Sequence, residues 1–212
     1  MQIIRLTLGA FETNCYLVEG EPGRCIVIDP ADGGARLLRE LGSRGLTPEA
    51  VLLTHGHYDH ILAVPDLQRR WPSLPVFCHP ADCPEALTEY DMGQEFPTVT
   101  AFANVQPLAE GQELSFAGLT ARVLETPGHT PGSVTFRIGD TLFTGDTLFY
   151  IDIGRTDFEG GSYPQMMRSL RRLALLDGDP EILPGHGPRT RLGYERRFNP
   201  YLKNGGGGVP WG

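Results

Sequence analysis

Three histidines and an aspartate are crowded into six consecutive residues of this chain. The segment reads His55-Gly-His57-Tyr-Asp59-His60. Several imidazoles held close together are poorly compatible with protonation, because each positive charge opposes the next, whereas a divalent cation needs their lone pairs. In a turn, His55 and His57 can direct both rings at one ion, and Asp59 and His60 can then face a second. The cluster therefore predicts a metal site, because no packing requirement calls for such a grouping.

Two further histidines and one aspartate lie in glycine-containing turns after apolar runs. His129 lies in Thr-Pro-Gly-His129-Thr-Pro-Gly, His186 in Leu-Pro-Gly-His186-Gly, and Asp146 in Thr-Gly-Asp146. Each taken alone could be only a turn residue. The sixth histidine, His79, has no such motif around it, and we interpret it as structural.

The elements that must position these residues fall into two β-rich halves. Apolar runs and alternating patterns predict strands over residues 3–8, 14–18, 25–29, 49–54, 75–79, 113–116, 119–125, 133–138, 141–144 and 181–184. Helical spacing is found over residues 35–41, 61–70 and 163–176. The crowded segment thus begins where an apolar strand leaves its sheet, a common place for sites in α/β proteins. Two such halves predict two packed sheets with helices outside.

Length and composition are those of an ordinary globular protein. The chain has 212 residues, and no central run of Pro, Gly, Ser or like charge marks a linker. We therefore expect one domain over residues 1–203 and a flexible Gly-rich tail over residues 204–212. With 18 Lys and Arg against 26 Asp and Glu, the net charge is −8, which argues against a nucleic-acid partner.

Neither a membrane nor an oxidising compartment is indicated. The N-terminus alternates apolar and polar residues, unlike a secretory signal, and no stretch approaches the ~20 apolar residues of a bilayer span. The four cysteines have no CxxC spacing. We expect reduced thiols and a cytoplasmic location, with a Cys15–Cys25 bridge as the alternative. The sequence gives no indication of the oligomeric state.

The ordered motifs resemble one known family. The segment from Thr54 to His60 resembles the signature of the metallo-β-lactamase superfamily, and the three later turns follow in the order of its further metal-binding segments. The resemblance runs from Asp29 to His186. It implies an α/β protein with an αβ/βα four-layer sandwich, in which two mixed sheets pack face to face. It also implies one metal on His55, His57 and His129, a second on Asp59, His60 and His186, and Asp146 bridging.

Two points about this site remain open in the sequence. Asp29 resembles a residue that supports a ligand from beneath, but it is equally a turn-forming Asp before Pro30. The identity of the metal is also open. Zinc is expected first, with iron or manganese as alternatives, since imidazole and carboxylate ligands suit all three.

The expected chemistry is hydrolysis. A pair of divalent cations lowers the pKa of a bound water to about 7, which yields a nucleophile for a carbonyl carbon. A thioester suits this chemistry because its thiolate leaves readily. We expect Asp59 and His60 to be catalytic, with Asp59 or the water chain handling the proton.

Smaller features resemble one subgroup. Asp rather than Cys at position 146 points away from the lactam-cleaving enzymes. The segment 154–161, the Asn-Pro-Tyr-Leu run at 199–202 and the length resemble the short glyoxalase II-like hydrolases. This implies S-D-lactoylglutathione or a similar hydroxyacyl thioester as the small-molecule substrate. Arg155 lies where that family uses a basic residue near the glutathione carboxylate, and Tyr150 is expected in the same pocket. For Arg155, the alternative is an ion pair with Asp157 that only fixes the loop. For Tyr150, the alternative is that it is simply a partly buried aromatic residue.

The chain departs from full-length glyoxalase II in one respect, and three other functions remain as alternatives. Only 26 residues follow His186, whereas full-length glyoxalase II has a helical C-terminal domain that supplies much of its glutathione site, so weak glutathione recognition is expected. A mononuclear iron persulfide dioxygenase carries similar motifs and is the main alternative. A superfamily nuclease is disfavoured by the acidic charge. A metal-binding module without activity is the third reading.

Overall fold

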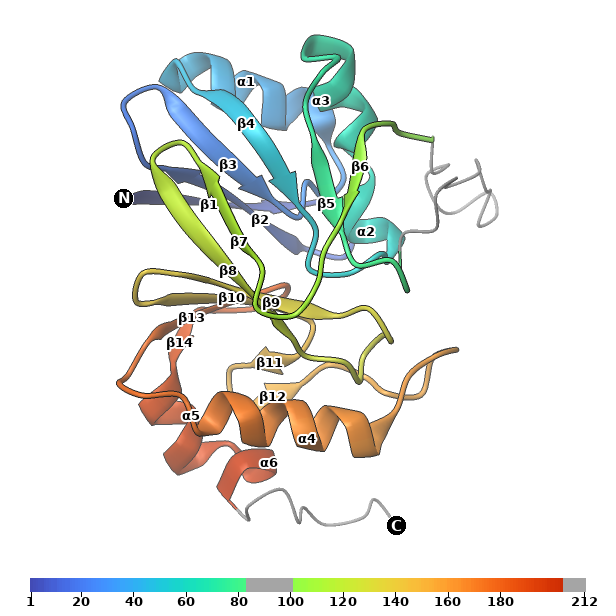
Figure 1. Ribbon diagram of the computed structural model, residues 1–212, viewed down its shortest axis with the longest axis vertical. Coiled ribbons are helices and arrows are strands. Elements are labelled where there is room, and N and C mark those ends of the chain that lie inside the picture. The colour runs from blue at the N-terminus through green and yellow to red at the C-terminus, as the bar shows by residue number, and fades with distance from the viewer. Residues whose placement is uncertain (83–100, 204–212) are drawn as a thin grey trace.

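The first of two β-sheets is built from the N-terminal half of the chain. The computed structural model describes residues 1–82 and 101–203, which form two six-stranded sheets lying face to face (Figure 1). The first sheet contains, in spatial order, β1 (Gln2–Leu8), β2 (Thr13–Glu19), β3 (Arg24–Ile28), β4 (Thr47–Leu52), β5 (Val76–Cys78) and β6 (Val105–Pro107). Strands β1 to β3 pair antiparallel, and β3 to β6 pair parallel. The sheet is therefore mixed, as predicted.

The second sheet comes from the C-terminal half. Its spatial order is β14 (Thr190–Arg191), β13 (Glu181–Pro184), β10 (Thr141–Gly145), β9 (Val134–Ile138), β8 (Leu119–Glu125) and β7 (Glu113–Phe116). Only β10 and β13 are parallel neighbours. A separate small hairpin, β11 (Leu148–Phe149) and β12 (Asp152–Ile153), follows β10.

Helices cover the outer side of each sheet. In Figure 1, α1 (Gly34–Arg44) and α3 (Val64–Arg70) lie over the first sheet, and α4 (Tyr163–Ala174), α5 (Leu192–Phe198) and α6 (Pro200–Lys203) lie beneath the second. The short α2 (Tyr58–Ile61) lies at one end of the first sheet. Helix α1 buries Leu37 and Leu41, and α4 buries Leu170 and Leu173. These spacings of four and three residues place each pair on one helix face.

The strands alternate between two hydrophobic clusters. In β3, Cys25 and Val27 pack in the cluster that contains the buried faces of α1 and α3. Ile26 and Ile28 point to the other side and pack between the sheets, where Phe143 of β10 meets them. A third cluster joins the second sheet to α4. Successive residues of a strand point to opposite faces, so this pattern produces the predicted αβ/βα sandwich.

The helix predicted over residues 61–70 is broken in the structure. Helix α2 ends at Ile61, and α3 begins at Val64. The N–H of Ala63 donates to the carbonyl oxygens of Pro30 and Ala31, at 2.9 Å each. Pro65 has no N–H and fits only the first turn of a helix, so α3 has to start beside it. Strands β6, β11, β12 and β14 and helices α5 and α6 were not predicted, because strands of two or three residues and helices of four to seven residues show too little periodicity.

The cysteines differ in part from expectation. Cys15 and Cys25 are buried and free, so the alternative bridge between them is not formed. Burial raises the pKa of the Cys25 thiol to about 12, which keeps it protonated. Cys78, however, is disulfide-bonded, so the expectation of reduced thiols is wrong there. Disulfide formation depends on proximity in space, and a pattern search for CxxC does not reveal it.

Within residues 1–82 and 101–203, no helix combines the length and apolar character that a bilayer crossing requires. The predicted flexible tail, residues 204–212, lies outside the described residues. The domain boundary at residue 203 and the cytoplasmic location stay predictions.

Candidate metal centre

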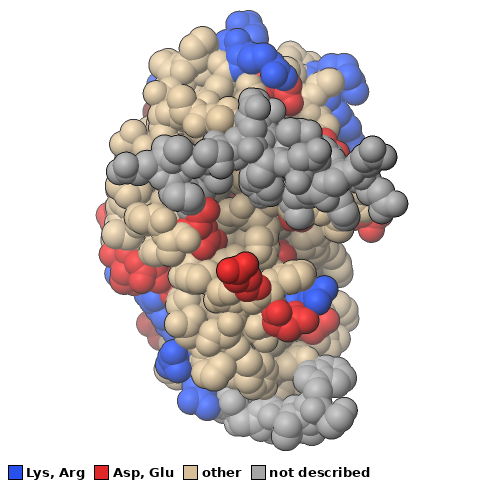
Figure 2. Space-filling view, turned by 90° about the vertical axis from the view of Figure 1, so that its right-hand side faces the viewer, with Lys and Arg blue, Asp and Glu red and all other residues tan. Residues whose placement is uncertain are grey.

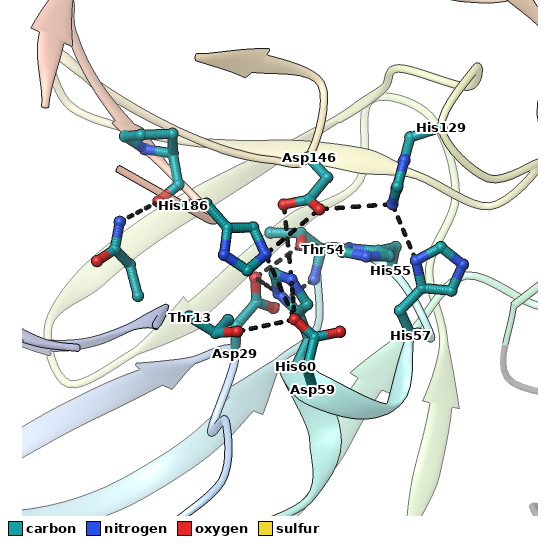
Figure 3. A network of polar contacts seen from close by, with 12 residues as sticks. Thr13, Asp29, Thr54, His55, His57, Asp59, His60, His129, Asp146 and His186 are labelled. Atoms are coloured by element: carbon teal, nitrogen blue, oxygen red, sulfur yellow. Dashed lines mark hydrogen bonds and ion pairs between the residues drawn. The ribbon is translucent and has the colours of Figure 1, made fainter. Parts of the chain in front are cut away.

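The predicted ligands all meet at one end of the space between the two sheets (Figure 3). The first sheet contributes the crowded segment, which follows β4 and continues into α2. The second sheet contributes the turns after β8, β10 and β13. Side chains far apart in sequence thereby face one another. The residues brought together are His55, His57, Asp59, His60, His129, Asp146 and His186.

Three imidazoles form a first group. Nε2 of His129 lies 2.9 Å from Nδ1 of His57. The ring of His55 lies edge-on to both, with centroid distances of 4.8 Å to His57 and 4.9 Å to His129. One nitrogen of each ring falls within 4.8 Å of the other two. Three imidazoles directed at one point are a ligand set suited to zinc or iron.

A second group combines one carboxylate with two imidazoles. Oδ2 of Asp59 lies 3.3 Å from Nε2 of His186 and 3.5 Å from Nε2 of His60. A tetrahedral cation with bonds of ~2.1 Å holds its ligand atoms about 3.4 Å apart. The spacing in this group therefore fits a bound cation.

Asp146 lies between the two groups. Its Oδ1 is 3.5 Å from Nε2 of His60, and its Oδ2 is 3.5 Å from Nε2 of both His129 and His186. Three buried atoms here have no hydrogen-bond partner within residues 1–82 and 101–203: Nε2 of His55, Nε2 of His60 and Oδ1 of Asp146. Buried polar atoms are rarely left unpaired, because losing water without a new partner is costly. A cation would satisfy all three, so the donor set fits two divalent ions with Asp146 shared between them.

Asp29 takes both of the roles that the sequence left open. It has a left-handed backbone, with φ at 48°, in the turn before Pro30. Its carboxylate also lies beneath the cluster, where Oδ2 is 2.9 Å from Nδ1 of His60. Thr54 fixes that carboxylate by donating from Oγ1 to Oδ2 at 2.7 Å and from its backbone N–H to Oδ1 at 2.8 Å. The His60 ring is thereby oriented with Nε2 toward Asp146.

Backbone carbonyls orient two further rings. Nδ1 of His129 donates to the carbonyl oxygen of Arg155 at 2.7 Å, and Nδ1 of His186 donates to that of Phe11 at 3.0 Å. A carbonyl only accepts, so the proton is on Nδ1 and the lone pair of Nε2 is free to bind a cation. Asp59 is held by Thr13, whose Oγ1 donates to Oδ2 at 2.8 Å.

The cluster holds opposing charges in a buried place. Burial, together with neighbouring imidazoles, lowers the pKa of His55 well below its usual value. Burial alone would also lower the pKa of His60, but the carboxylates around it, Asp146 first, outweigh burial and raise that pKa to about 10. Burial would raise the pKa of Asp59, but His60 and donated hydrogen bonds hold it well below its usual range. A cation would compensate the carboxylates without a protonated ring.

A pocket of about 650 Å³ opens onto the cluster. Phe11, Phe149 and Phe158 contribute apolar surface to it. Five of the seven predicted ligands also line it: His57, Asp59, His129, Asp146 and His186. His60 is fully buried, at 0% exposure, and is not among the lining residues. Of the two residues predicted to be catalytic, Asp59 therefore faces the space for a substrate, and His60 lies behind the ligands.

The two predicted substrate contacts are placed differently. Arg155 lines the pocket, but its guanidinium forms two hydrogen bonds with Asp157, at 2.9 and 2.8 Å, and lies 4.2 Å from the ring centroid of Phe158. Tyr150 is not a lining residue. Its ring stacks on Tyr194 with centroids 5.4 Å apart, and the two hydroxyls are 3.0 Å from each other. The structure does not bring Tyr150 to the pocket wall.

His79 lies outside the cluster, as expected for a structural residue. Its Nε2 is 3.4 Å from Glu125, and its Nδ1 accepts the N–H of Ala81 at 3.2 Å. Sequence reasoning missed Thr13 and Asp82, which contact the metal-binding segments. Neither lies in a motif, and both contacts join residues distant in sequence.

Acidic side chains gather across the middle of the face in Figure 2, and basic ones lie mostly toward its upper and lower ends. This distribution agrees with the net charge of −8. The absence of a nucleic-acid partner stays a prediction.

Curated relatives extend over most of the chain. An uncharacterised protein of Mycobacterium tuberculosis is 39% identical over 96% of this chain and 98% of its own length. A hydroxyacylglutathione hydrolase of Xylella fastidiosa is 42% identical over 86% of this chain, and the match spans 64% of that hydrolase.

Solved structures agree with the architecture. The BLEG-1 B3 metallo-beta-lactamase aligns with a TM-score of 0.86 and 33% identity over 95% of this chain and 99% of that one. TTHA1623, solved in a di-iron-bound form, aligns at 0.83 and 40% over 94% and 100%. ETHE1 from Myxococcus xanthus aligns at 0.78 and 31% over 96% and 85%.

A family model gives the same assignment. The model of the metallo-beta-lactamase superfamily matches residues 8–186, which include every residue of the candidate metal centre. The chain belongs to the metallo-beta-lactamase superfamily, and its relatives support the glyoxalase II-like subgroup within it.

Proposed function

We propose that this superfamily enzyme is a binuclear metal-dependent hydrolase of hydroxyacyl thioesters, with S-D-lactoylglutathione or a similar compound as substrate. The observation that carries the proposal is the pair of three-residue ligand groups with Asp146 between them, open to one pocket. Divalent ions held there would polarise an acyl carbonyl and supply a nucleophile from water at neutral pH.

The chain's own residues would orient the substrate and handle its proton. The apolar walls formed by Phe11, Phe149 and Phe158 exclude water from the acyl group and leave it facing the ligands. Asp59 lines the pocket, and Thr13 fixes its Oδ2, so its carboxylate is positioned to accept a proton at the pocket surface. His60 would act as a ligand held by Asp29, because it has no access to the pocket.

A persulfide dioxygenase is the second candidate. The similarity to ETHE1 from Myxococcus xanthus favours keeping it, and the di-iron form of TTHA1623 supports testing iron. In this reading, the imidazoles of the first or second group would hold a single iron ion.

Metal analysis and two assays on one preparation distinguish the candidates. We expect two metal ions per chain, cleavage of S-D-lactoylglutathione, loss of that activity with a chelator and its return with zinc. One iron per chain, with oxygen consumed in the presence of glutathione persulfide and no thioester cleavage, would replace the hydrolase by the dioxygenase. A chromogenic β-lactam belongs in the same series, because of the similarity to BLEG-1.

A further inference from the structure

Asp82 lies just after β5 and connects two segments of the metal centre through two backbone N–H groups and one hydroxyl. One of its carboxylate oxygens, Oδ2, accepts the backbone N–H of Gly56 at 3.1 Å and the hydroxyl of Thr130 at 2.5 Å. The other, Oδ1, accepts the backbone N–H of Gly132 at 2.7 Å. One partly buried carboxylate therefore receives three hydrogen bonds from two loops.

Those loops carry the whole first ligand group. Gly56 separates His55 from His57, and Thr130 directly follows His129. The loops come from different sheets, one after β4 and the other after β8. Asp82 thus fixes the distance between the two segments whose rings have to converge on one ion.

The backbone around Asp82 is built for this contact. A Cβ atom on Gly56 would lie 2.4 Å from the carbonyl oxygen of Asp82, and one on Gly132 would lie 2.5 Å from its Oδ1. Atoms at such distances overlap, so a side chain at Gly56 would push against the Asp82 backbone, and a side chain at Gly132 would displace the Asp82 carboxylate. Both glycines are explained by the close approach of Asp82.

The second ligand group is held by other residues. Thr13 holds Asp59, Asp29 holds His60, and the carbonyl of Phe11 holds His186. A change at Asp82 therefore acts on one group and leaves the supports of the other in place.

We propose that Asp82 is a positioning residue for the metal ion bound by His55, His57 and His129. This inference rests on the proposed metal centre and does not depend on which substrate is cleaved. Asp82→Asn keeps the size of the side chain but replaces one acceptor oxygen by a donor, so at least one of the loop contacts is lost. Partners that orient metal ligands typically change metal affinity by about 10- to 100-fold when they are removed.

Zinc affinity in two single-site backgrounds tests the proposal. In a His186→Ala background, the second ligand group is broken, and competition with a chromophoric chelator measures the zinc affinity of the first group. In a His129→Ala background, the first group is broken, and the same competition measures the zinc affinity of the second group. We expect Asp82→Asn to weaken zinc binding by about 10- to 100-fold in the first background and to leave it unchanged in the second.

Two further variants separate positioning from general damage. Gly132→Ala keeps the Asp82 carboxylate but displaces it, and it should give the same selective loss. Asp179→Asn is a matched control, because Asp179 also accepts a glycine N–H, that of Gly193 at 2.6 Å, and an arginine, but it lies before β13, whereas the ligand His186 follows the other end of that strand. Asp179→Asn should leave the zinc affinity unchanged in both the His186→Ala and the His129→Ala background. The fold of each metal-free variant is compared by circular dichroism and thermal unfolding.

The outcomes are distinct. Equal weakening in both backgrounds, or unchanged affinity in the His186→Ala background, overturns the proposal. Zinc binding with the expected selectivity but no thioester cleavage overturns the proposed function and supports the role of Asp82.

Discussion

Asn14 provides a sharp test of how the fold holds His186. Its buried side chain lies on β2 and reaches across to the end of β13 and the turn that follows it. There its Nδ2 donates to the carbonyl oxygens of Pro184, at 3.0 Å, and Gly187, at 2.9 Å. These carbonyls lie on either side of His186. We expect Asn14→Ala to destabilise the protein and to loosen this one ligand.

The structure sets the size of the effect. Each of the two hydrogen bonds contributes about 1 kcal/mol net to stability. Neither carbonyl is left without a donor, because the Tyr16 hydroxyl also donates to Pro184 at 2.6 Å and Nη1 of Arg5 donates to Gly187 at 3.2 Å. No further penalty for an unpaired acceptor is therefore added. The expected loss is about 2 kcal/mol in the free energy of unfolding. Asn14→Asp should cost more, because it places an acceptor against two carbonyl oxygens.

Urea unfolding of the metal-free variants measures this loss. Tyr16→Phe is the comparison, because it removes one hydrogen bond to Pro184 and should cost about half as much. Zinc competition in the His129→Ala background then reports whether the second group has loosened. A loss under about 0.5 kcal/mol for Asn14→Ala, which is typical of a surface change, would refute the reasoning. So would an Asn14→Asp variant as stable as Asn14→Ala.

Three further predictions concern the cluster and the pocket. Asp146→Ala should lose binding of one ion and most turnover while the chain stays folded; unchanged metal content and activity would contradict the shared position of Asp146. The metal-free protein should be most stable near pH 6.5. Below that value, the unfolded chain binds protons that His55 resists in the fold, so stability falls as the pH falls. Above it, the stability from protonated His60 is lost as the pH rises through about 10. Thermal unfolding from pH 5 to 10 with a chelator checks both arms, and a flat profile would count against them. Arg155→Met should raise KM for S-D-lactoylglutathione several-fold with little change in kcat if Arg155 contacts the substrate, and Asp157→Asn should not; equal effects of both would favour the loop-fixing pair.

The ligands could be predicted because their motifs are local and ordered. His129, Asp146 and His186 each lie in a glycine-containing turn, and their order along the chain carried the family resemblance. The fold followed from the same pattern, since alternation in strands such as β3 requires buried surface on both sides. The break between α2 and α3 was missed although Pro65 marks where α3 can start, because the end of α2 also depends on Ala63 bonding to carbonyls some thirty residues earlier.

The supporting residues could not be predicted in this way. Asp82 meets its partners across 26, 48 and 50 residues of sequence. Thr13 meets Asp59 across 46. Both are common residue types with ordinary neighbours, and only the folded arrangement gives them a role. Arg155 shows the reverse case, since the sequence located it at the pocket but left its pairing with Asp157 open.

The metal centre joins the two sheets, and this has a consequence for stability. The crowded segment belongs to the first sheet, and His129, Asp146 and His186 belong to the second. Polar contacts of Asp29, Thr13 and other residues outside the cluster hold the ligand atoms of the second group at cation spacing. Because the folded chain already holds these ligands in place, metal binding should require little rearrangement of the backbone. The free energy of metal binding should therefore appear almost wholly as a higher free energy of unfolding. Metal should therefore raise Tm strongly while leaving circular dichroism unchanged, and a large change in secondary structure on binding would show that the ligands are not held in advance.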